Sequence, residues 1–132
     1  MSFFKKNKNP TDTIKTAIMK LMINQTQDNI NNFKRSFSAI YNNSSWVLIP
    51  GCQTAKGFQL FCFKENGKDY AAIFTDYTEA KKHSGDFASI DITKIVPHIF
   101  NNNEIAGIVV DPYSLNFYME KHFIAECIMY KE

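Results

Sequence analysis

The chain has 132 residues, of which 45% are hydrophobic and twelve are phenylalanine. This suffices for one hydrophobic core without disulfides, and no apolar run approaches the ~20 residues that a membrane span needs. The net charge of +2 is spread along the chain. It therefore predicts no electrostatic steering field, and neither nucleic acid nor a membrane surface is expected as a partner.

Cysteine usage and the first residues predict the compartment. Cys52, Cys62 and Cys127 are odd in number and widely spaced, which is typical of reduced thiols in a cytoplasmic protein. The first residues do not follow the order of a signal peptide. The many Lys, Asn and Ile residues point to an AT-rich bacterial source. We expect a frayed tail at 1–8 and a single domain over 9–132.

Two amphipathic helices are predicted at the start of the domain. Asn9 is expected to cap the first helix, with Pro10 in its first turn. Its apolar face is predicted to be Ile14, Ala17, Ile18, Leu21 and Met22. The apolar face of the second helix is predicted to be Ile30, Phe33, Phe37, Ile40 and Tyr41. Lys34 and Arg35 lie off this face and are expected to be solvated.

The strongest turn signal is Asn66-Gly67, because both residues accept the positive φ of a type I′ hairpin. The arm before it, Phe58–Lys64, is apolar on both alternating faces except for Gln59, which predicts a strand covered on both sides. The second arm is Tyr70–Thr75. We therefore expect this hairpin at the centre of the sheet and not at an edge.

Two helices with clear start signals are expected in the second half. Asp76 can cap the first, Glu79 completes a capping box, and Gly85 is expected to end this helix. Asp91 can cap the second. Pro97 falls inside that helix, where it removes a backbone donor and should kink the helix or delay its start.

Short strands and a final helix complete the prediction. The expected strands are Trp46–Ile49, Phe87–Ile90, Ile105–Val110 and Leu115–Met119. Asp111 and Pro112 occupy the first two positions of a turn between the last two strands, and a helix is expected over Glu120–Tyr130. The predicted fold class is α+β. Two N-terminal helices precede a mixed or antiparallel sheet of five to six short strands, with helices packed on it and a C-terminal helix.

Two strand-end motifs suggest a family. They are Ala72-Ile-Phe-Thr-Asp76 and Gly107-Ile-Val-Val-Asp-Pro112. With the element order, they resemble the SseB-type N-terminal domain, a family named for a serine-sensitivity phenotype, over roughly Asn9 to Ile128. Asp76 and Asp111 replace the Ser and Asn that are commoner in the family. The resemblance implies an α+β domain of poorly defined role, with no known catalytic residues.

The same strand ends supply the candidate site. If both strands point the same way, their ends would form a rim for a ligand or peptide. The residues of this predicted rim are Phe74, Thr75, Asp76, Asp111 and Pro112. The structural alternative is that Asp76 only caps a helix and Asp111 only starts a turn. The local sequence favours this alternative, because both roles are predicted without a ligand.

No constellation of catalytic or metal-binding residues stands out. Cys52 follows Pro50-Gly51 in a loop, but a reactive thiol needs a base, and no motif surrounds His83, His98 or His122. The histidines and cysteines lack zinc-site spacing, and no glycine-rich phosphate loop is present. We therefore expect no enzyme, no metal and no cofactor.

Lys56–Phe63 nearly matches an RNA-binding strand pattern, but Leu60 and Gln59 depart from it, and two helices precede the first strand. These aromatic residues are therefore expected to be core. We expect a non-catalytic interaction or regulatory domain that binds another protein or forms a homodimer. The alternative is a small-ligand (amino-acid) sensor with a pocket near Asp76 and Asp111, and an RNA-binding module is less favoured.

Overall fold

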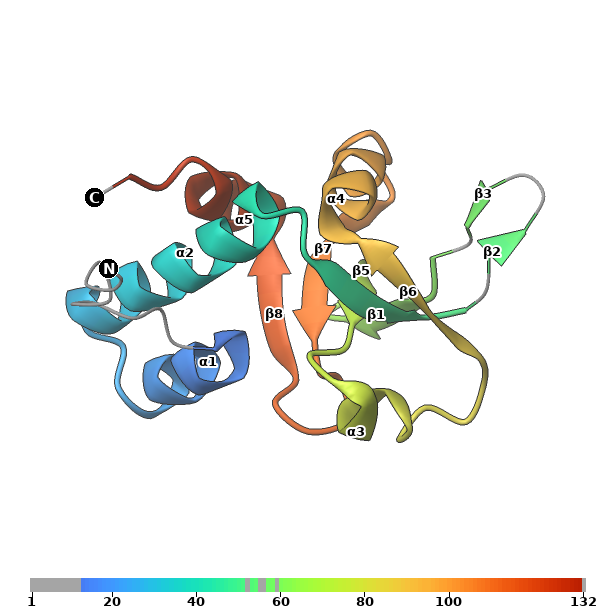
Figure 1. Ribbon diagram of the computed structural model, residues 1–132, viewed down its shortest axis with the longest axis horizontal. Coiled ribbons are helices and arrows are strands. Elements are labelled where there is room, and N and C mark those ends of the chain that lie inside the picture. The colour runs from blue at the N-terminus through green and yellow to red at the C-terminus, as the bar shows by residue number, and fades with distance from the viewer. Residues whose placement is uncertain (1–12, 52, 55–56, 59, 132) are drawn as a thin grey trace, which may run out of the picture.

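The computed structural model describes residues 13–51, 53–54, 57–58 and 60–131. The expected tail at 1–8 and the expected cap at Asn9 lie outside them. The fold is α+β, as predicted. The helices at the two ends of the chain are α1 (Ile14–Ile23), α2 (Gln27–Asn42) and α5 (Lys121–Ile128) (Figure 1). Thr13 and Thr26 cap α1 and α2, because each side chain accepts a backbone N–H three residues on.

The main sheet has four strands in the order β4-β5-β7-β8. They are β4 (Cys62–Glu65), β5 (Lys68–Ile73), β7 (Ile105–Val110) and β8 (Phe117–Glu120). The sheet is mixed: β5 and β7 are parallel, whereas the two outer pairs are antiparallel. Because parallel neighbours end on the same side, the carboxyl ends of β5 and β7 meet at one edge of the sheet.

Two smaller antiparallel pairs accompany the main sheet. β1 (Trp46–Pro50) pairs with β6 (Phe87–Asp91), and β2 (Gln53–Thr54) pairs with β3 (Gly57–Phe58). The first pair is attached to the end of β5, where Phe74 N donates to Leu48 O at 2.7 Å. β1 thus continues the same edge of β5 next to the start of β4, where Ala72 N donates to Phe61 O.

The predicted hairpin is present, but its place in the sheet differs from the prediction. Asn66 and Gly67 have φ values of 53° and 77°, as a type I′ turn requires. Only β5 is central, because β7 occupies its other side and leaves β4 at the edge. Phe61 is 47% exposed, so the first arm is not covered on both sides. The side chain of Phe58 lies outside the described part of the chain.

The helix after β5 is shorter than expected. α3 (Tyr77–Ala80) ends well before Gly85. The N–H groups of Lys82 and His83 donate to the carbonyl oxygens of the residues three positions earlier, so the chain continues in tighter turns of the 3₁₀ type. Asp76 caps α3 as predicted, since its Oδ1 accepts from Glu79 N at 2.9 Å. The capping box is only half formed, because the Glu79 side chain has other partners.

The next helix begins where it was predicted. α4 (Ile92–Phe100) follows Asp91, whose Oδ1 accepts from Thr93 N at 2.9 Å. Pro97 does not delay the start of α4 and lies inside the helix. It cannot donate to the carbonyl of Thr93, so that one helical hydrogen bond is missing.

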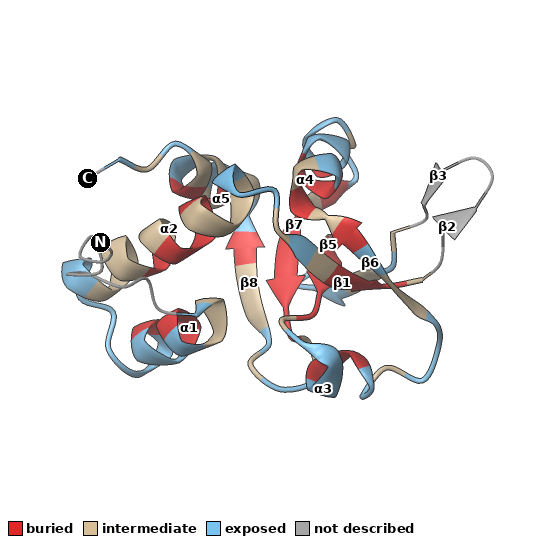
Figure 2. Cartoon of the chain, in the orientation of Figure 1, coloured by how far each residue is buried: buried red, intermediate tan, exposed pale blue. Residues whose placement is uncertain are grey.

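The main core lies between one face of the sheet and the helices (Figure 2). The helices contribute Ile18 from α1, Phe33 and Phe37 from α2, Ile95 and Ile99 from α4, and Ile124 and Cys127 from α5. The sheet contributes Ala71, Ile73, Ile108, Val110 and Met119. The opposite face carries a smaller cluster around Tyr70, Ala72 and Val109.

Two predictions about the N-terminal helices are wrong in detail. Met22 was expected on the buried face of α1 but is exposed. Lys34 was expected to be solvated, yet it is largely covered and its Nζ lies 3.0 Å from Glu126 Oε1 on α5. Within the described residues, no helix is long and apolar enough to cross a bilayer.

Candidate functional site

The ends of β5 and β7 are joined by Thr75 and Asp111. Thr75 N donates to Asp111 Oδ1 at 2.8 Å, and Thr75 Oγ1 donates to Oδ2 at 2.7 Å. Asp111 is fully buried, has a φ of 50°, and its N–H donates to Ile73 O. Burial raises the pKa of Asp111 against the opposing effect of the Thr75 donors. Both carboxylate oxygens are therefore engaged within the protein and not presented to a ligand.

The other members of the predicted rim have separate positions. Phe74 is buried in a small cluster with Leu48. Asp76 is exposed, caps α3 and lies 3.7 Å from Lys15 Nζ. Pro112 lies in the predicted turn, which Ser114 N closes by donating to Asp111 O at 3.0 Å. The structure thus brings Thr75 and Asp111 together, whereas Asp76 and Asp111 have the structural roles that the sequence favoured.

Glu79 is a buried carboxylate that the sequence did not single out beyond its place in a capping box. It accepts from Ser114 Oγ at 2.6 Å, Lys15 Nζ at 2.9 Å and Lys82 Nζ at 3.2 Å. Burial alone would raise the pKa of Glu79, but these three donors outweigh it and lower the pKa to about 2. Glu79 therefore stays ionised at neutral pH and links α1, α3 and the β7–β8 turn.

An aromatic cluster covers Phe74 on the outside. Tyr113 stacks on Phe74, and its hydroxyl lies 3.0 Å from His83 Nδ1. Phe61 and Phe63 contact each other and extend the cluster along β4. Phe61 was expected in the core as part of the near-match to an RNA-binding strand, and its exposure corrects that expectation.

A small cavity lies at the carboxyl ends of β5 and β7, beside Thr75. We call it the strand-end cavity; its volume is about 90 Å³. Its inner wall is formed by the buried residues Phe37, Ile73, Ile92 and Val110. Its outer wall is formed by Ile40, Val47, Thr75 and Trp46. Trp46 is 67% exposed, so the cavity borders the surface there.

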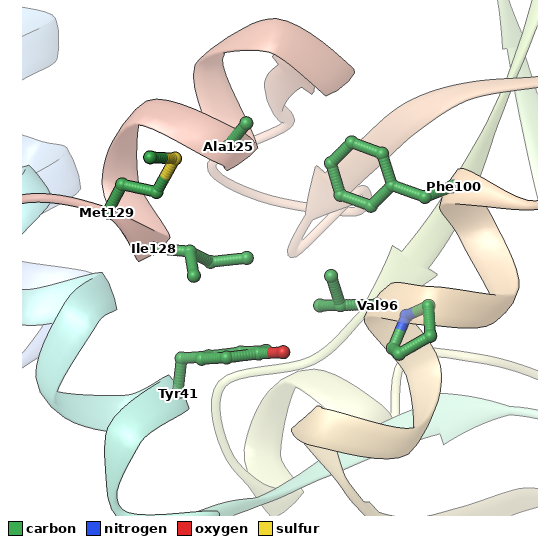
Figure 3. A pocket seen from close by; sticks show the side chains of 7 residues that line it. Tyr41, Val96, Phe100, Ala125, Ile128 and Met129 are labelled. Carbon is green, nitrogen blue, oxygen red and sulfur yellow. The ribbon is translucent and has the colours of Figure 1, made fainter.

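A larger apolar hollow lies between α2, α4 and α5. We call it the helical groove; its volume is about 240 Å³. Its lining is Tyr41, Val96, Pro97, Phe100, Ala125, Ile128 and Met129. Figure 3 shows Val96 and Phe100 of α4 opposite Ala125 and Ile128 of α5, with Tyr41 of α2 closing one side. The sequence predicted Tyr41 on the apolar face of the second helix, but it gave no signal that this face borders a gap.

The described thiols do not resemble nucleophiles. Burial raises the pKa of Cys62 and raises that of Cys127 to about 12. Cys52 lies outside the described residues. Within the described part of the chain, no three His, Cys, Asp or Glu side chains are grouped as metal ligands.

No family model, curated protein or solved structure matches this chain. The resemblance to the SseB-type domain therefore stays a prediction. The helical groove and the strand-end cavity are two places where the described residues leave room for another molecule beside apolar walls.

Proposed function

We propose that the chain is a non-catalytic binding domain that holds an amphipathic helix of another protein in the helical groove. The observation that carries this proposal is the apolar lining from three helices together with the exposure of its rim. Met129 is 75% exposed, and Phe100 is also exposed. Large apolar side chains that gather at the surface beside a hollow mark interaction sites in soluble proteins.

The form of the groove favours a helix as its occupant. α4 and α5 supply opposite walls, an arrangement that accepts apolar anchors at helical spacing from a third helix. The volume of about 240 Å³ lies below the roughly 300–1,000 Å³ of pockets that hold drug-sized ligands. A few anchoring side chains fit this space better than a larger free ligand does.

The charge on the two helices that form opposite walls of the groove, and just after α5, favours an acidic partner helix. Lys94 on α4, Lys121 on α5 and Lys131 just after α5 are all basic. The one acidic side chain on these two helices, Glu126, is paired with Lys34. A partner helix with acidic residues beside its apolar face would therefore meet complementary charge.

A second copy of this chain is a less favoured occupant. The described helix with the most exposed apolar residues is α1, where Met19, Met22 and Ile23 face solvent. The charged residues of α1 are Lys15 and Lys20, so α1 would bring like charge to the groove. The resemblance to the SseB-type domain agrees with a binding role, because that family implies no catalytic residues.

Labelled synthetic peptides test the proposal through fluorescence anisotropy. One peptide has Leu at helical spacing and Glu on its flanks, a second has Lys in place of Glu, and a third has the first composition in scrambled order. We expect the Glu-flanked peptide to bind most tightly. Met129→Lys should weaken its binding at least about tenfold, as for an anchor position. Ile23→Lys is the matched control, at a residue that is 84% exposed on α1.

Two outcomes would refute the proposal. The first is equal binding of the ordered and scrambled peptides, and the second is unchanged binding by Met129→Lys. Sedimentation at several protein concentrations tests the homodimer separately. If the protein is a dimer and Met129→Lys dissociates it, the occupant of the groove is a second copy of this chain and not a helix of another protein.

A further inference from the structure

The strand-end cavity is distinct from the helical groove, because the two share no lining residue. It sits where two neighbouring parallel strands end, which is the position where open sheets with parallel strands form ligand crevices. Its inner wall is buried and its outer wall includes Trp46. The opening is therefore on the side of Trp46, and the closed end is against Ile73 and Val110.

The polar atoms at this cavity favour a ligand that donates a hydrogen bond. Two hydroxyl side chains line the cavity, Ser45 and Thr75. The hydroxyl proton of Thr75, at the strand end, is already directed to Asp111 Oδ2 at 2.7 Å. The lone pairs of Thr75 Oγ1 can still accept. A ligand hydroxyl or N–H placed beside Thr75 would find an acceptor there.

The walls determine the charge and size of the ligand. The side chains that line the cavity are uncharged, and burying an unpaired charge among them would be strongly unfavourable. Lys15, next to the lining residue Ile14, has its ammonium bound to Glu79 at 2.9 Å. The volume of about 90 Å³ is smaller than an engineered apolar cavity of roughly 150 Å³ that holds benzene.

We infer that the strand-end cavity is a binding site for a small, uncharged, branched aliphatic molecule that carries a hydroxyl or N–H donor. The branched apolar part lies against Ile73, Ile92 and Val110, and the donor faces Thr75. This inference changes the amino-acid sensor predicted from the sequence. The cavity is at the predicted strand ends, but a zwitterion has no charged partner for its carboxylate among the lining side chains.

The emission of Trp46 provides the assay, because the chain contains one tryptophan and it lines the cavity. The probe is 2-methylpropan-1-ol, which has fewer non-hydrogen atoms than benzene, and leucine is the comparison because it has the same isobutyl group on a zwitterion. We expect a saturable change in Trp46 emission with the alcohol and none with leucine. No saturable change up to the solubility limit of the alcohol, or an equal response to leucine, would overturn the inference.

Variants locate the response. Val47→Phe places a ring at the cavity wall and should abolish the response, whereas Ser89→Phe places the same ring at an exposed position on β6 and should keep it. If Val47→Phe does not fold, Ile40→Phe on α2 serves the same purpose. Thr75→Val should weaken alcohol binding about two- to tenfold through loss of one hydrogen bond. A full change in Trp46 emission in Val47→Phe would contradict binding in the strand-end cavity.

Discussion

Replacing Glu79 with Gln should remove a pH-dependent part of the stability. Glu79 has an ordinary pKa of 4.5 when unfolded and a pKa of about 2 when folded. Each pKa unit corresponds to ~1.4 kcal/mol, so ionised Glu79 stabilises the folded state by about 3 kcal/mol at neutral pH. Because the folded pKa is the lower one, this stability is present above pH 4.5 and is lost as the pH falls toward 2.

Urea unfolding of the wild type and Glu79→Gln across this pH range measures the effect. The difference in unfolding free energy should shrink by about 3 kcal/mol between roughly pH 5 and pH 2. Other acidic groups titrate in both proteins and cancel in the difference. Glu104→Gln, at an exposed position, is the control and should show little difference at any pH. A Glu79→Gln difference that stays constant with pH would refute the role assigned to the Lys15 and Lys82 contacts.

Three further predictions concern the strand ends and the core. Gly107→Ala should destabilise the fold by more than about 3 kcal/mol, because the added Cβ would collide with the backbone carbonyl of Met119. Thermal or chemical unfolding measures this loss, and an unchanged midpoint would contradict the close pairing of β7 and β8. Asp111→Ala should lower the free energy of unfolding by about 2–3 kcal/mol, because it leaves the Thr75 N–H unpaired. Asp111→Asn should cost less, because Asn keeps an acceptor and tolerates the φ of 50°. Equal losses of stability in the two variants would count against this explanation. Cys127 in the folded protein should resist alkylation, because its thiol is buried and has a pKa of about 12. Peptide mapping measures the modification. Modified Cys127 before unfolding would contradict the prediction and show that the core opens.

The features that the sequence predicted well depend on neighbouring residues. Asn66-Gly67 specifies its turn by backbone preference alone. Asp76 and Asp91 cap helices with their own side chains, and Asp111 with Pro112 sets the turn after β7. Such interactions span a few residues, so each can be predicted from the local sequence without knowledge of the fold.

The features that the sequence missed depend on distant partners. Glu79 is held by Lys15, which is 64 positions away. The edge position of β4 follows from the parallel pairing of β5 with β7, which local patterns do not encode. The helical groove exists because α4 and α5 both pack on the sheet but leave a gap between them. An apolar helix face predicts burial, yet this gap leaves part of Phe100 and Met129 exposed.

Methyl NMR of the protein with the Glu-flanked helical peptide tests the binding role of the helical groove most directly. The methyl groups of Val96, Ala125, Ile128 and Met129 line the groove, and we predict that they shift on binding while those of Ile23 on α1 do not. Shifts confined to other parts of the surface, or no shifts at saturating peptide, would contradict the proposal that the groove holds a partner helix.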